Sequence, residues 1–296
     1  MALPLTGVYA MLVCVTGGLF AEHLWIQFAL LAVSSYLMME LNNANALIRI
    51  YSRMVSCSYL VLAVMSHFLF VDIRCGIVQV CFVAFYIFMF GSYQDNRAVG
   101  RAFYAFLMLG IASAMFVQIL FFVPVIWLLF VTNIMARSFR VFVATLFGLL
   151  VPYAFLATYW VYIGQPEMLV SHFLQIAQFG NVLDWHALPL SHIVTTLFVS
   201  ALSVLGMIHF RLNNYKDKIR TRMLFEVFSV MSICTMLFIL LQPQHIDYLL
   251  ALLIVSTAPM VGHYIALTHT FITNLSFYAM IAVALSLTFF NVWMPF

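Results

Sequence analysis

Histidine and carboxylate side chains gather in a few polar connections between long apolar stretches. Asp184, His186 and His192 lie in one connection, and His245 and Asp247 lie in another. Such a mixture can bind a divalent cation, relay protons, or supply a general acid and a general base. We take these five residues as candidate catalytic residues, with dispersed, solvated loop residues as the alternative. Their spacing matches no zinc signature, so no metal site is predicted.

Glu226 is a carboxylate about four residues inside an apolar stretch. An acid within a membrane helix is a candidate for coupling in a transporter. Arg222 precedes it by one helical turn and offers a structural alternative, an ion pair on one helix face.

One connection, residues 211–222, is strongly basic. Its cations are candidates for contact with lipid headgroups or with a partner protein. They are Arg211, Lys216, Lys218, Arg220 and Arg222.

The amino-acid composition indicates the environment in which this chain folds. Of its 296 residues 66% are hydrophobic and 7% charged, with mean hydropathy +1.11. A soluble domain carries about 25% charged residues, so we expect one integral membrane domain over residues 1–296 and no soluble domain. The net charge of +3 is too small to indicate nucleic acid as a partner.

Motif searches exclude several function classes. The chain has no P-loop, no dinucleotide-binding glycine motif, no haem-attachment motif and no G-x-S-x-G elbow. Direct ATP hydrolysis is therefore not expected, and no cofactor can be named.

The apolar stretches predict an all-α, polytopic transmembrane bundle of about eleven spans, within a range of nine to eleven. Residues 102–136 make one span or two, and we expect two, divided near Gln118 and Pro124. The expected spans are 3–21, 24–39, 54–71, 76–92, 102–117, 120–136, 141–163, 188–209, 223–241, 247–263 and 267–291.

Charge distribution predicts the topology. With the N-terminus inside and eleven spans, only Arg74 of the twelve basic residues falls outside. Because cytoplasmic loops are enriched in Lys and Arg, we expect a cytoplasmic N-terminus and a periplasmic C-terminus. His263 and His269 flank the last inner turn, where we expect them to be solvated.

Two segments have the pattern of short interfacial helices. In Leu41–Arg53 the polar side chains share one helical face, and in Gln165–Leu188 apolar residues recur at helical spacing before a turn at Gly180–Asn181.

Three segments resemble a family of multi-pass membrane proteins from Bacteroidota that has no assigned activity. They are Glu40–Leu62 (ELNNANALIRIYSRMVSCSYLVL), Ser92–Leu129 (SYQDNRAVGRAFYAFLMLGIASAMFVQILFFVPVIWLL) and Arg137–Tyr153 (RSFRVFVATLFGLLVPY). The resemblance covers about residues 40–163 and implies a bacterial inner membrane. In architecture the chain is also similar to membrane glycosyltransferases that use lipid-linked sugars, although its first outer loop holds only the acid Glu22.

Three functions remain open. The chain is a component of bacterial envelope assembly, acting with a membrane-protein partner subunit, or a glycosyltransferase-like enzyme on the outer face, or a secondary transporter. Whether it is an enzyme at all is not decided by the sequence. Membrane lipids are partners in every case.

Overall fold

The computed structural model describes residues 2–180, 185, 188–268 and 270–293. Over these residues the chain forms thirteen α-helices and four short 3-10 helices, and no strand. The predicted all-α fold is therefore confirmed. The chain divides into two compact units, which we describe separately. Unit 1 comprises Met1–Val80 and Leu183–Phe296, and unit 2 comprises Cys81–Val182.

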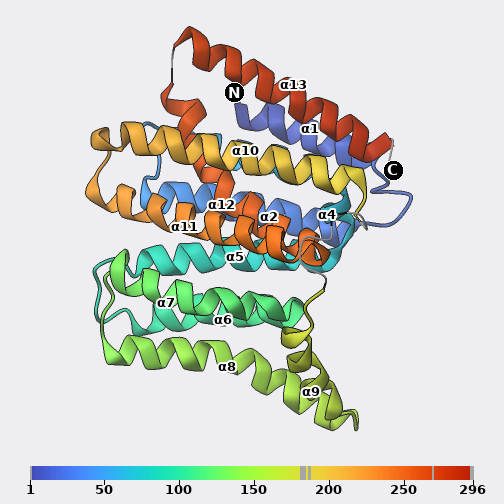
Figure 1. Ribbon diagram of the computed structural model, residues 1–296, viewed down its shortest axis with the longest axis vertical. Helices are drawn as coiled ribbons and strands as arrows, with labels where there is room; N and C mark the ends of the chain where they lie inside the picture. The colour runs from blue at the N-terminus through green and yellow to red at the C-terminus, as the bar shows by residue number, and fades with distance from the viewer. Residues whose placement is uncertain (1, 181–184, 186–187, 269, 294–296) are drawn as a thin grey trace. The chain divides into compact units, whose positions relative to one another are not determined.

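Unit 1 contains both ends of the chain (Figure 1). Its elements are α1 (Ala2–Thr16), α2 (Trp25–Asn45), α3 (Met54–Met65), α4 (His67–Val71), the first part of α5 (Ile73–Gly91), α10 (Leu190–Asn213), η3 (Asn214–Lys216), α11 (Ile219–Leu241), η4 (Pro243–His245), α12 (Ile246–Leu267) and α13 (Phe271–Trp293).

Helix α12 forms the centre of unit 1. Almost all of its side chains are buried, as expected for a helix that is apolar on every face. It packs against α3, α10 and α11. Two glycines permit the close approach, because a Cβ on Gly206 would lie 2.8 Å from the Cβ of Met260, and one on Gly262 would lie 2.9 Å from the Cα of Val55.

Unit 2 contains the rest of α5 together with α6 (Val99–Met115), η1 (Val117–Phe122), α7 (Val123–Thr132), α8 (Phe139–Tyr162), α9 (Glu167–Leu174) and η2 (Gln175–Ala177). Its main packing is α6 against α8. Gly148 lies against the backbone carbonyl of Phe103, and the Tyr153 hydroxyl donates to Ser113 Oγ at 2.8 Å.

Within each unit, successive long helices run in opposite directions, so their connections collect at two ends (Figure 1). In unit 1, Arg220 Nη2 donates to Asn45 Oδ1 at 2.8 Å and ties the basic connection to the end of α2. In unit 2, the backbone N–H of Arg137 donates to Asn96 Oδ1 at 2.8 Å. Apart from Arg74 at the start of α5, the arginine-bearing connections of each unit therefore meet at one end, which we call the basic end of that unit.

Six helices are long and apolar enough to cross a membrane, by length and composition. They are α5, α8, α10 with its η3 extension, α11, α12 with η4, and α13. These helices indicate a membrane protein, as the composition predicted. The figure of about eleven spans is not confirmed: α1, α3, α6 and the η1–α7 segment are shorter apolar helices, and α2 ends in a polar stretch with Glu40 and three asparagines.

The predicted break within residues 102–136 is confirmed. Helix α6 ends at Met115, Phe116 is extended, and α7 begins at Val123. Pro124 lies in the first turn of α7, where its missing N–H costs no helical hydrogen bond.

The predicted interfacial helix over Leu41–Arg53 is wrong. Helix α2 continues to Asn45 and ends at Ala46, which has a positive φ of 48°. The side chain of Asn42 then organises a non-helical connection: its amide donates to the Ser52 carbonyl at 2.9 Å and its Oδ1 accepts from Ile48 N–H at 3.3 Å. The second predicted surface helix is present as α9, which buries none of its residues fully.

Candidate functional site

A buried acid–histidine pair lies at the basic end of unit 1. Asp217 Oδ2 is 3.1 Å from His263 Nε2, and the two side chains are only 3% and 1% exposed. Asp217 follows η3, and His263 lies in the last turns of α12. The expectation that His263 is solvated is therefore wrong, because α12 is covered on all sides.

A second histidine completes this cluster. The His209 ring, on α10, is centred 5.9 Å from the His263 ring and 4.9 Å from the Tyr264 ring. Phe210 and Phe225 pack around His263, with ring centroids 5.3 and 5.0 Å away. The imidazole of His263 is thus enclosed by aromatic rings on most of its faces.

Three polar side-chain atoms of this cluster are without a hydrogen-bond partner among the described residues. Asp217 Oδ1, His263 Nδ1 and His209 Nε2 are buried, and no hydrogen-bond partner for them occurs in the part of the chain that the structure describes. A buried polar atom without a partner costs about 1–3 kcal/mol. These three atoms therefore favour water, a proton or a ligand at this position.

The connection that carries Asp217 is held by its own arginine. Arg222 donates from Nε to the Asp217 carbonyl at 3.0 Å and from Nη2 to the Tyr215 carbonyl at 3.1 Å. Of the five predicted headgroup or partner cations, Arg220 and Arg222 therefore have roles within the fold. Arg211, Lys216 and Lys218 are exposed, so they stay candidates for an external partner.

Glu226, the predicted coupling carboxylate, lies on the exposed side of α11. The hydrogen bonds of Arg222 described above go to backbone carbonyls. The role of Glu226 in transport stays a prediction.

The opposite end of unit 1 brings together two of the predicted catalytic residues. His192 Nε2 lies 3.2 Å from Asp247 Oδ1, with side chains 17% and 48% exposed. His192 Nδ1 is 3.3 Å from Ser191 Oγ, and its ring stacks on Phe68 at 3.8 Å. The imidazole is therefore contacted at both nitrogens and on one face. Asp247 Oδ1 is itself buried and makes no hydrogen bond within the described residues, although the Asp247 side chain as a whole is half-exposed.

Of the other three predicted catalytic residues, His245 lies among the residues that the structure describes. His245, in η4, makes a 3.0 Å contact with the side-chain nitrogen of Gln244. Asp184 and His186 lie outside the described residues. A further acid, Asp72, lies near Asp247, since both act electrostatically on Cys75. Asp72 accepts from Arg74 N–H at 2.9 Å.

Buried hydroxyl groups lie along the helices that join the two pairs. Thr196 and Ser203 on α10, Ser232 on α11 and Thr257 on α12 are each at most 3% exposed. Their oxygens find no hydrogen-bond partner among the described residues. From Asp247 to His263, α12 rises about 24 Å at 1.5 Å per residue. The two His–Asp pairs are therefore separated by nearly the thickness of a bilayer core.

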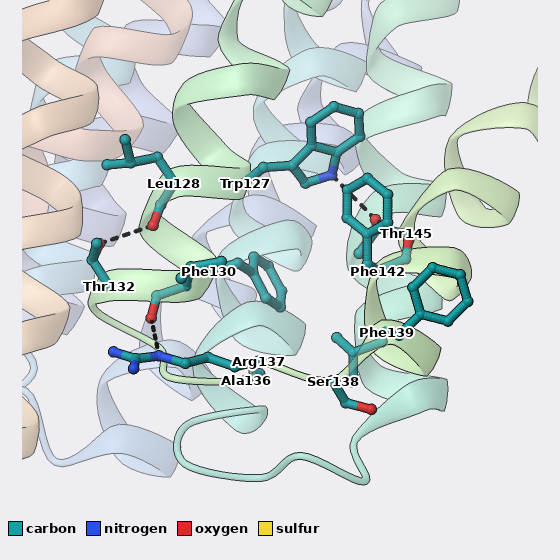
Figure 2. Close-up of a pocket in the computed structure, with 12 residues that line it drawn as sticks. Trp127, Leu128, Phe130, Thr132, Ala136, Arg137, Ser138, Phe139, Phe142 and Thr145 are labelled. Carbon is teal, nitrogen blue, oxygen red and sulfur yellow. Dashed lines mark hydrogen bonds between the residues drawn. The ribbon is translucent and has the colours of Figure 1, made fainter.

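Unit 2 offers a different kind of site, an apolar groove between α7 and the start of α8 (Figure 2). Its volume is about 590 Å³. The Trp127 indole donates to Thr145 Oγ1 at 3.1 Å, and Arg137 Nε donates to the Val131 carbonyl at 3.0 Å. The groove suits hydrocarbon, since no carboxylate or histidine lines it.

Metal chemistry has no obvious place in the described residues: no group of three histidine, cysteine or acidic side chains is arranged to hold an ion.

Reasoning from sequence missed Asp217, His209 and His263. Asp217 was one acid in a basic loop, and the histidines were flanking residues of apolar spans. The available signal was that His209 and His263 both fall near the inner ends of predicted spans. Comparison with known proteins adds no further assignment, because no family model, no curated protein and no solved structure matches this chain.

Proposed function

We propose that this chain is a proton-translocating transport protein of a bacterial inner membrane, with the Asp217–His263 pair as its protonation site. The observation that carries the proposal is that pair: an acid and an imidazole 3.1 Å apart, both nearly inaccessible, in a bundle of apolar helices. Ionisable groups at such positions are expensive and commonly mark proton pathways.

Asp217 already anchors its connection through the backbone carbonyl that Arg222 holds. The side chains of Asp217, His263 and His209 nevertheless present three unpartnered atoms among the described residues. A proton that moves among these groups, or on water beside them, uses those atoms.

The second His–Asp pair supplies the other end of a path. His192 and Asp247 are partly exposed, so they can exchange protons with water. The buried hydroxyls of Thr196, Ser203, Ser232 and Thr257 lie at intermediate depths on α10, α11 and α12. Hydroxyl groups donate and accept at once, which a relay with intervening water requires.

The proposed orientation follows from the positive-inside rule. The basic end of unit 1, with Arg49, Arg53 and the 211–222 connection, then faces the cytoplasm, and the end with Arg74 faces the periplasm. This places the N-terminus in the cytoplasm and the C-terminus in the periplasm. Protons would enter at His192–Asp247 and leave through Asp217–His263.

The test is proton entry into liposomes that contain the reconstituted protein and an internal pH dye. With an imposed membrane potential, we expect the wild type to acidify the lumen faster than protein-free vesicles. Asp217→Asn and the surface-end variant His192→Gln should each bring the rate back to that background. Glu167→Gln, which changes an exposed acid of α9, is the matched control and should behave as the wild type.

Two results would overturn the proposal: a wild-type rate no higher than that of empty vesicles, or an unchanged rate in both variants. Because His192 is partly exposed, His192→Gln is expected to fold even if Asp217→Asn does not.

The second candidate is an outer-face enzyme, favoured by the oriented His192 and the half-exposed Asp247. It predicts that Asp247→Asn abolishes turnover of a lipid-linked sugar while proton entry persists. A role as a subunit in envelope assembly instead predicts a stoichiometric protein partner in native mass spectrometry of the gently purified protein.

A further inference from the structure

A cavity of about 150 Å³ lies inside unit 1, away from both His–Asp pairs. It is lined by α1, α3, α10, α12 and α13 and is open on one side, where Ile281 is 41% exposed. Its wall is almost wholly apolar and includes Leu62, Leu202, Val261, Phe277 and Ile281. Since one water takes up about 30 Å³ of liquid, this cavity has room for only a short length of hydrocarbon chain.

One polar group interrupts this wall. Ser58, on α3, is 6% exposed and lines the cavity. Its hydroxyl has no hydrogen-bond partner within the described part of the chain. Because an unpaired buried hydroxyl costs about 1–3 kcal/mol, a cavity occupant that brought an acceptor within reach of Ser58 would be favoured.

A second, surface cavity adjoins the first at the basic end. Its lining includes Ala2 and Met54, which also line the internal cavity. Beside them are Tyr51, Ser52 and Arg53, and Arg53 Nη2 donates to the Tyr51 hydroxyl at 3.2 Å. This fixes a guanidinium group at the mouth of the apolar cavity.

The three features follow the order of groups in a phospholipid. Arg53 lies at the surface, where a phosphate would be, and a guanidinium binds phosphate through charge-assisted hydrogen bonds. Ser58 follows about 7.5 Å deeper along α3, at 1.5 Å per residue, near the level of an acyl ester. The apolar cavity beyond it accommodates the start of an acyl chain.

We propose that this is a specific binding site for one anionic phospholipid, with its phosphate on Arg53, an ester oxygen at Ser58 and an acyl chain in the internal cavity. The charge at the mouth favours an anionic over a zwitterionic headgroup. The lipid site does not include the residues of the proposed proton path. Its test is therefore independent of the test of the proposed function.

The experiment is native mass spectrometry of the purified full chain, delipidated in detergent and then titrated with phosphatidylglycerol or phosphatidylcholine. The wild type should retain one phosphatidylglycerol molecule in preference to phosphatidylcholine. Arg53→Gln should weaken phosphatidylglycerol retention about tenfold, the loss of one charged hydrogen bond, and leave phosphatidylcholine unchanged. Arg211→Gln, an exposed arginine of the same end, is the charge control.

Filling the cavity tests the acyl-chain part. Ala284→Leu adds volume to the wall and should reduce retention of both lipids, whereas Ala279→Leu, on the exposed face of α13, should not. Ser58→Ala should weaken retention of both lipids to a smaller extent.

Equal losses in Arg53→Gln and Arg211→Gln would overturn the site, since they would indicate general attraction to the basic end. Wild-type retention in Ala284→Leu would overturn the placement of the chain. Tighter retention of a polyprenyl phosphate, which has no ester, would overturn the assignment to a phospholipid.

Discussion

The two His–Asp pairs of unit 1 have the same chemistry and opposite surroundings. At the basic end, Asp217 and His263 are 3% and 1% exposed, whereas at the opposite end His192 and Asp247 are 17% and 48% exposed. The distances are nearly equal, 3.1 and 3.2 Å. The buried pair is joined by a hydrogen bond, whereas Asp247 Oδ1 makes none with His192. The two pairs therefore differ in geometry as well as in burial.

The largest expected contrast concerns which side of the membrane each end occupies. Cysteines introduced at exposed Lys216 and Arg74, in a variant without the native cysteines, should react with an impermeant maleimide from opposite sides only. Labelling of both positions from one side would place the two pairs in the same compartment and remove the proposed path. A cysteine introduced at position 184 should be labelled from the same side of the membrane as a cysteine at position 74.

Removing one partner of each pair should have very different effects on stability. Asp217→Ala should lower the free energy of unfolding by about 3–5 kcal/mol, because it leaves a buried imidazole without its partner. Asp247→Ala should cost less than about 1 kcal/mol, as exposed pairs do. Unfolding in mixed micelles measures both. Equal losses would show that burial does not distinguish the pairs.

Replacing both buried partners separates stability from function. The double variant Asp217→Leu, His263→Phe should recover at least about 2 kcal/mol relative to Asp217→Leu alone, because the His263 imidazole is no longer buried without its partner. Its proton entry should nevertheless stay at background. Recovery of proton entry together with stability would contradict the role of the pair in transport.

The smallest effect concerns His172, an imidazole outside the candidate spans. Burial lowers the pKa of the His172 imidazole, and a hydrogen bond to the backbone of Ser113 opposes that shift. The unfolded chain therefore binds the proton first, so the packing of α9 is most stable above pH 6.5 and weakens as pH falls below that value.

The His172 ring is centred 6.0 Å from the Trp160 ring, so its protonation should change the indole fluorescence. We expect a change of less than half of the Trp160 signal, with a midpoint below pH 6.5, and no such change in His172→Phe. A midpoint above 6.5 would contradict the lowered pKa.

Much of the helical pattern was predictable, since apolar runs and their breaks are local properties. The division of residues 102–136 followed from Pro124 and from the placement of arginines. The failure at Leu41–Arg53 has a specific cause. Polar residues at helical spacing also occur where a spanning helix simply ends, and only the bonds of Asn42 to Ile48 and Ser52 distinguish the two cases.

The candidate site was predictable only in part. His192 and Asp247 were chosen because they lie in two connections that are rich in histidine and carboxylate, and the structure brings them together. Asp217 and His263 were not chosen, because an acid within a basic loop is usually solvated. What buries Asp217 is the cover provided by η3, α10 and α12, which no local pattern encodes.

By itself, the sequence determined that this chain is an all-helical membrane protein and that its arginines favour one end of each unit. Composition and charge act on each segment separately, so their effect can be judged without knowing which segments are in contact. The tertiary structure decided which polar groups meet. Asp217 and His263 are separated by 46 positions, and their contact depends on the close crossing of α10 and α12 at Gly206 and on the rotation of each helix about its axis.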